Sequence, residues 1–232
     1  MGTVAAAPAA MAAPKATAEP TTIVFPGSSW GVKAGPTAVG PGPNFFSDDP
    51  ENVWVDAAGQ LHLRITYRDG QWRAAEVLLD RSLGYGTYRF NLASPVGNLD
   101  PNVVLGLFTW SDNPAYNNRE IDIEIARWGS ATAATNAGYA VQPADRARNT
   151  HRYLQPDTAP TSQEFTWEPN RVSFRSATDT GATIASWKYT GSDVPRSGDE
   201  RTRINLWLDG GRAPLSGTGV EVVLSSFTFT PR

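Results

Sequence analysis

The chain has 232 residues, with 23 acidic and 20 basic side chains, two histidines and no cysteine. The net charge of −3, without a basic block or a basic amphipathic helix, argues against a nucleic-acid or membrane partner. The lack of cysteine excludes disulfides, thiolate catalysis and cysteine-ligated zinc, and the two isolated histidines predict no metal cluster.

The first 21 residues differ in composition from the rest. Residues 1–21 are dominated by alanine and proline, and no basic residue precedes Lys15. Such a composition predicts a disordered leader or linker. The alternative is the remnant of a secretion signal, although the charged start and the apolar middle are missing. Residues 22–232 are expected to form a single domain.

From residue 22 onward, short strand-like segments are separated by glycine and proline. Residues 61–67 alternate apolar and polar side chains, and Asp69-Gly70 then predicts a hairpin turn. No segment has sustained helical periodicity, so we predict an all-β antiparallel sandwich or jelly roll. Further strands are expected over residues 52–55, 75–79, 86–92, 103–110, 119–126, 136–141, 163–167, 171–175, 183–189, 203–208 and 219–230.

The segment from residue 120 to 125 alternates carboxylates with isoleucines. On a strand, Glu120, Asp122 and Glu124 share one face, and the isoleucines face a core. Neighbouring carboxylates repel and raise one another's pKa, which is useful at a catalytic site. The pattern alone leaves a solvated strand face as an equal alternative.

A catalytic interpretation sets a geometric requirement. Retaining glycosidases hold two carboxyl groups about 5 to 5.5 Å apart. Positions 120 and 124 of a flat strand are separated by roughly 13 Å, so the sheet must curve to bring the side chains together. Asp122 could hydrogen-bond one neighbour and keep the two protonation states apart. We expect Glu120 to ionise first and its charge to keep Glu124 protonated.

The motif, preceded by Phe108-Thr109-Trp110 and followed by Gly129, resembles the active-site signature of glycoside hydrolase family 16, in its lichenase-like form. The resemblance spans residues 22–230, and its specific part is residues 108–129. It implies a concanavalin A-like jelly roll with a concave substrate cleft and retaining cleavage of β-glucans. It assigns Glu120 as nucleophile, Asp122 as the assisting carboxylate and Glu124 as general acid/base.

The resemblance also implies substrate-binding residues, for which ordinary strand packing is the alternative. Trp128 lies on the carboxylate face only if the motif strand stays regular. Leu78 stands where lichenases carry an arginine, so no residue is assigned as the hydrogen-bond donor to the sugar at this position. Residues 225–227 lack the aspartate with which lichenases bind calcium, so neither a metal nor another cofactor is predicted. The implied substrate-binding residues are Glu76, Trp110, Trp128, Asn136, Asn205 and Trp207.

We therefore predict a secreted, monomeric, retaining endo-glycosidase acting on a neutral polysaccharide or oligosaccharide. A non-catalytic carbohydrate-binding sandwich is one alternative, because fold does not determine function. A transglycosylase is another, because it uses the same catalytic residues. The sequence leaves the polysaccharide and its linkage open.

Overall fold

The computed structural model describes residues 20–116 and 119–232, so most of the predicted leader lies outside the described residues. In this part of the chain no helix is long and apolar enough to cross a membrane. The described residues form these strands and short 3₁₀ turns: β1 (Thr22–Val24), β2 (Ser29–Val32), β3 (Phe45–Phe46), β4 (Val53–Val55), β5 (Leu61–Arg68), β6 (Gln71–Ser82), β7 (Gly86–Leu92), β8 (Val103–Trp110), η1 (Pro114–Tyr116), β9 (Ile121–Ala126), β10 (Ala137–Val141), β11 (Thr150–Tyr153), β12 (Thr161–Glu168), β13 (Arg171–Thr178), β14 (Thr183–Tyr189), β15 (Arg201–Leu208), η2 (Asp209–Gly211) and β16 (Val220–Pro231).

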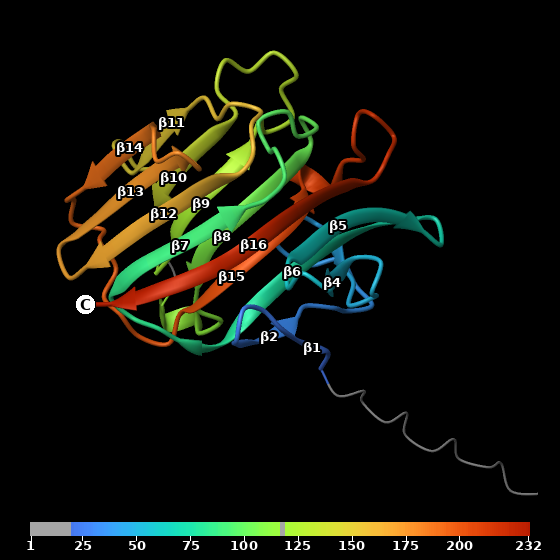
Figure 1. Cartoon of the computed structure of the whole chain (residues 1–232), viewed down its shortest axis with the longest axis horizontal. Coiled ribbons are helices and arrows are strands. Elements are labelled where there is room, and N and C mark those ends of the chain that lie inside the picture. Colours follow the sequence, from blue (N-terminus) through green and yellow to red (C-terminus); the bar gives the residue numbers. More distant parts are fainter. Residues whose placement is uncertain (1–19, 117–118) are drawn as a thin grey trace, which may run out of the picture.

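The strands form two layers that overlie one another (Figure 1). One layer, here called the cleft sheet, has the order β11-β10-β9-β8-β15-β6, and the other, the back sheet, has the order β5-β16-β7-β12-β13-β14. The hairpin of β5 and β6 joins them, and its turn residues Asp69 and Gly70 both have positive φ. All strand pairs are antiparallel except the short contact of β3 with β6. This architecture confirms the predicted all-β jelly roll.

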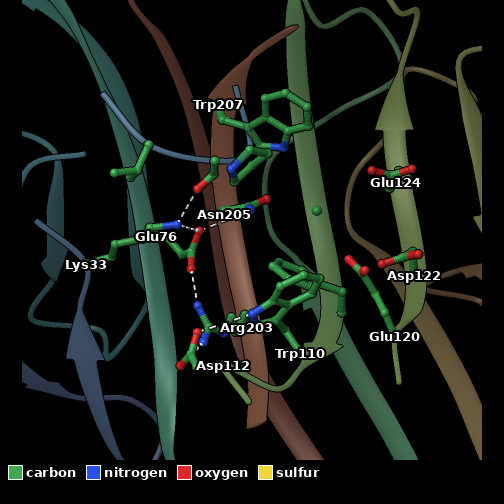
Figure 2. Close-up of a pocket in the computed structure, with 15 residues that line it drawn as sticks. Lys33, Glu76, Trp110, Asp112, Glu120, Asp122, Glu124, Arg203, Asn205 and Trp207 are labelled. Atoms are coloured by element: carbon green, nitrogen blue, oxygen red, sulfur yellow. Dashed lines mark hydrogen bonds and ion pairs between the residues drawn. The ribbon is translucent and has the colours of Figure 1, made fainter. Parts of the chain in front are cut away.

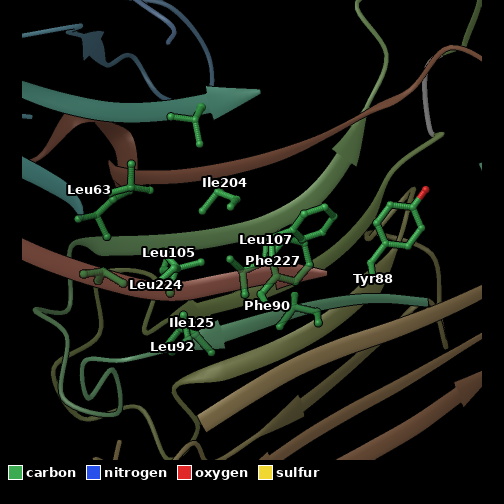
Figure 3. Close-up of a cluster of buried hydrophobic side chains, with 14 of the residues drawn as sticks. Leu63, Tyr88, Phe90, Leu92, Leu105, Leu107, Ile125, Ile204, Leu224 and Phe227 are labelled. Atoms are coloured by element: carbon green, nitrogen blue, oxygen red, sulfur yellow. The ribbon is translucent and has the colours of Figure 1, made fainter. Parts of the chain in front are cut away.

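The hydrophobic core lies between the two sheets (Figure 3). Leu105 and Leu107 of β8 and Ile125 of β9 meet Phe90 and Leu92 of β7, and all are at most 1% exposed. Burying each such side chain contributes about 1.5–3 kcal/mol. Because strand side chains alternate between faces, the same packing turns the even-numbered residues of β8 and β9 away from the core.

The strands expected from alternation are present, with two kinds of difference. The strand expected over residues 75–79 extends over 71–82 as β6, and the motif strand begins at Ile121, one residue after Glu120. The structure adds β1, β2, β3 and β11, which have two to four residues and are too short for alternation to reveal. Thr21, at the end of the predicted leader, already accepts a hydrogen bond from the Val32 amide at 2.8 Å.

Candidate active site

The carboxylate triplet lies in the middle of the cleft sheet. Its isoleucines at 121, 123 and 125 enter the core, at 0 to 1% exposure. Glu120, Asp122 and Glu124 therefore face away from the back sheet, as the alternation predicts. Asp122 is only 3% exposed, whereas both glutamates are partly exposed. Asp122 and Glu124 lie in the ladders with both β8 and β10, whereas the carbonyl of Glu120, just before β9, accepts a hydrogen bond from the backbone amide of Gln142 at 3.1 Å.

Glycines stand beside Glu124 on both neighbouring strands. Gly106 of β8 and Gly138 of β10 are its direct cross-strand partners. A Cβ on Gly106 would lie 2.4 Å from Oδ1 of Asn205, so the Asn205 side chain reaches across Gly106 toward β9. The glycines thus leave the space beside Glu124 free for other side chains and for a ligand.

The three carboxylates line a cleft of about 540 Å³. In Figure 2 they occupy one side of it, Glu76 and its partners the other, and Trp110 and Trp207 lie between. The segment 39–41 contributes a wall, which Lys33 supports by donating from Nζ to the Gly40 carbonyl at 2.7 Å. The lining residues are Lys33, Val39, Gly40, Pro41, Glu76, Gly106, Phe108, Trp110, Asp112, Glu120, Asp122, Glu124, Arg203, Asn205 and Trp207.

Burial makes all three carboxyl groups weaker acids. It raises the pKa of Glu120 to about 7, with repulsion from Glu124 adding to the rise and Asp122 opposing it. It raises the pKa of Glu124 to about 8, with the charge of Asp122 as the second cause. Burial also holds the pKa of Asp122 well above its usual range, against a hydrogen bond from Gln142 Nε2 at 3.0 Å. Burial, rather than the neighbouring charge expected from the sequence, is thus the main cause that keeps Glu124 protonated.

Glu76 anchors a charged network on the opposite side of the cleft. It is 1% exposed. Its carboxylate accepts hydrogen bonds from Lys33 Nζ at 3.0 Å, Arg203 Nη1 at 2.9 Å and Asn205 Nδ2 at 3.3 Å. Arg203 also donates from Nη2 to Asp112 at 2.6 Å. Among the described residues that line the cleft, both cations are therefore paired with carboxylates.

Two of the predicted tryptophans line the cleft, and the third lies beyond its end. Trp110 donates from Nε1 to Asp112 at 3.2 Å, and Trp207 is 8% exposed. The condition for Trp128 to share the carboxylate face is not met, because β9 ends at Ala126 and Trp128 has a φ of 51°. The turn instead brings the Trp128 ring edge-on to Trp207, with centroids 6.1 Å apart, and leaves Trp128 41% exposed.

The structure does not bring Asn136 into the cleft, which corrects its prediction as a substrate-binding residue. Asn136 is 4% exposed, and its amide donates to the carbonyls of Gly97 at 2.6 Å and Gln155 at 2.9 Å. Its Oδ1 accepts a hydrogen bond from the Gln155 amide at 2.7 Å. The side chain precedes β10 and fastens two loops together, so its polar atoms are already used.

Sequence reasoning missed the cleft residues Lys33, Asp112 and Arg203. Arg203 could have been found, because it alternates with Asn205 and Trp207 on β15 and must share their face. Arg203 is also the register partner of Leu78 in the pairing of β6 with β15. A cation therefore lies next to the position at which this chain has leucine. The other two lie outside regular strands and carry no periodic signal. In the part of the chain that the structure describes, no three His, Cys, Asp or Glu side chains are grouped to hold a metal ion.

Solved structures with this fold include bacterial β-glucanases. The Bacillus licheniformis β-glucanase aligns with a TM-score of 0.67 at 19% identity, over 88% of this chain and 92% of that chain. A lichenase from a mouse hindgut metagenome gives 0.66 at 20% identity, over 88% and 93%. A Mycobacterium tuberculosis protein described as an immunostimulatory antigen and pseudo β-1,3-glucanase gives 0.65 at 19% identity, over 88% and 91%. No protein-family model matches the sequence, and no curated protein sequence matches it significantly. The comparisons establish the jelly-roll fold of these glucanases.

Proposed function

We propose that the protein is a retaining glycoside hydrolase that cleaves internal bonds of a neutral β-glucan. The observation that carries this proposal is the carboxylate triplet along one side of a cleft of about 540 Å³. The two outer carboxyls have raised pKa values, about 7 for Glu120 and about 8 for Glu124. Near neutral pH, one can therefore be ionised while the other is protonated, as double displacement requires.

The motif resemblance assigns the roles, and the raised pKa values of both glutamates are compatible with them. Glu120 attacks the anomeric carbon and forms a glycosyl ester, while Glu124 gives its proton to the departing glycosidic oxygen. Glu124, now a carboxylate, then takes a proton from the water that breaks the ester. Asp122 lies between the two glutamates and holds Glu120 in position. Asp122 itself accepts a hydrogen bond from Gln142. Two inversions at one carbon retain the β-configuration.

Several cleft features support a neutral sugar substrate. Lys33 and Arg203 are neutralised by the carboxylates that they contact, so the cleft offers an anionic substrate no free cation among its described lining residues. Trp110 and Trp207 offer aromatic surface for sugar rings. Nε of Arg203 and Oδ1 of Asn205 are buried without hydrogen-bond partners in the described structure. A sugar hydroxyl, which both donates and accepts, can satisfy such a pair.

Hydrolysis assays on mixed-linkage glucan, laminarin, xyloglucan and agarose test the proposal. Glu120→Gln and Glu124→Gln should each lower kcat by at least about a thousandfold with retained fold, because each glutamate bears a separate chemical step. NMR of the first product's anomeric proton should show the β-form. An α-product, or near-normal activity of both variants, would rule out the assigned roles.

A non-catalytic carbohydrate-binding protein is the second candidate. It is favoured by the structural neighbour that is described as a pseudo β-1,3-glucanase. Affinity electrophoresis on the same polysaccharides separates the two: binding without any product supports this candidate, whereas product formation excludes it. A transglycosylase shares the glycosyl ester and differs in its acceptor, so added oligosaccharide should yield longer products. Secretion and a monomeric state stay predictions.

A further inference from the structure

Arg152 stands in the same cross-strand row as Glu124. The row runs from Glu124 of β9 to Gly138 of β10 and on to Arg152 of β11, because Gly138 is the register partner of both. Directly paired residues of antiparallel strands project their side chains to the same face. Arg152 therefore faces the same side of the sheet as Glu124, separated from it by a residue that has no side chain.

The Arg152 side chain lies over Gly138 and reaches the catalytic strand. A Cβ on Gly138 would be 3.0 Å from Cδ and 3.1 Å from Nη1 of Arg152. Nη2 donates to the carbonyl of Ala126, on β9, at 2.7 Å. It makes a longer contact with the Thr135 carbonyl at 3.4 Å. The guanidinium thus crosses β10 and is fastened two residues beyond Glu124.

We propose that Arg152 is a positioning residue for the general acid/base, a role that rests on the proposed glycosidase function. It holds the end of β9 in place and sets a permanent positive charge beside Glu124. Once Glu124 has transferred its proton to the departing oxygen, it must exist as a carboxylate in a half-buried site, and the Arg152 charge stabilises that form. The same carboxylate then accepts a proton from water, so both steps depend on it.

The other charges around Glu124 do not replace this one. The Arg152 charge lowers the pKa of Glu124, against the rise caused by burial and by Asp122. Arg152 is itself a weaker base than usual, since burial lowers its pKa while Glu124 raises it. The other charged groups that line the cleft with Glu124 are Glu120 just before β9, Asp122 on β9, Arg203 on β15, Asp112 after β8, Glu76 on β6 and Lys33 after β2.

Four variants separate charge from packing. Arg152→Met removes the charge, and Arg152→Lys keeps the charge with a different shape. Gly138→Ala keeps every charge but places a Cβ against the Arg152 side chain, which is flexible enough to move away. Arg175→Met is the matched control, because Arg175 is an arginine of the back sheet that also donates to a carbonyl, that of Gly181.

The readout is the pKa of Glu124 from carboxyl ¹³C NMR titration of the full chain, with the resonance assigned by its loss in Glu124→Gln. Arg152→Met should raise this pKa by about 0.5 to 1.5 pH units, the size expected for one charge up to about 10 Å away, the span of two strand spacings, at an effective dielectric constant of about 20 to 40. Gly138→Ala should raise it in the same direction, Arg152→Lys should change it less, and Arg175→Met should leave it unchanged.

A purely structural role would lower the melting temperature without moving the titration, and that result overturns the proposal. So does an equal change in Arg175→Met. If Arg152→Met fails to fold, the Gly138→Ala variant decides. A Glu124 pKa in Gly138→Ala equal to that of the parent refutes the electrostatic effect of Arg152. The titration can be measured without turnover. A shifted Glu124 pKa in a protein without hydrolytic activity would refute the proposed function and support the electrostatic effect of Arg152. Hydrolytic activity with an unshifted Glu124 pKa would support the proposed function and refute the electrostatic effect of Arg152.

Discussion

Replacing Glu124 with glutamine should stabilise the protein at neutral pH while it abolishes catalysis. In the folded chain the pKa of Glu124 is raised from 4.5 to about 8. Between these values the folded state holds a proton that the unfolded state has lost, so stability falls as pH rises. The contribution is fully present below the unfolded value of 4.5 and is lost progressively up to about 8. Glutamine has no such titration.

The expected size follows from the pKa difference. Each pH unit within this range costs about 1.4 kcal/mol, so moving from about pH 5 to about pH 7 costs the parent about 3 kcal/mol through Glu124. Because Glu120 and Asp122 titrate with it, we expect the Glu124→Gln variant to avoid about 2 to 3 kcal/mol of this loss.

Urea denaturation of parent and variant at both pH values measures this double difference in the free energy of unfolding. Glu51→Gln is the control, because the Glu51 side chain is 71% exposed and its surface pair with Arg68, at 3.7 Å, contributes at most about 1 kcal/mol. A pH dependence of Glu124→Gln within about 0.5 kcal/mol of the parent's would refute burial as the origin of the acid, since experimental error in such measurements is of that order.

Three further predictions follow from the cleft. Trp128→Ala should raise KM several-fold with little change in melting temperature, because Trp128 is 41% exposed; a large thermal destabilisation would instead indicate a packing role. The pH profile of kcat/KM should be a narrow bell that rises as Glu120 ionises near about 7 and falls as Glu124 ionises near about 8; an optimum below about pH 5 would contradict these assignments. Arg203→Met should destabilise the protein by about 3 kcal/mol in urea denaturation, because it removes a buried partner of Glu76. Adding Glu76→Gln should restore part of this loss. Additive losses of unfolding free energy in the double variant would argue against the pair.

Side-chain alternation explains why much of the fold was predictable. The isoleucines of β9 and the apolar residues of β5 and β7 place their strands in a sandwich before any partner strand is known, because the two faces of a strand follow from backbone geometry alone. The same local rule puts Glu120, Asp122 and Glu124 on one face. The resemblance to a glycosidase motif adds roles to these residues, which stay predictions.

The sequence by itself therefore determined the all-β class, the orientation of most strands and the common face of the carboxylates. Only the tertiary structure decided which strands are neighbours. Glu76 and Asn205 are 129 residues apart in the chain and become register partners, and Gly138 lies between Glu124 and Arg152. Alternation is a property of consecutive residues, whereas register depends on packing of the whole sandwich. Consequently the charged network, the turn at Trp128 and the position of Asn136 outside the cleft could not be read from local patterns.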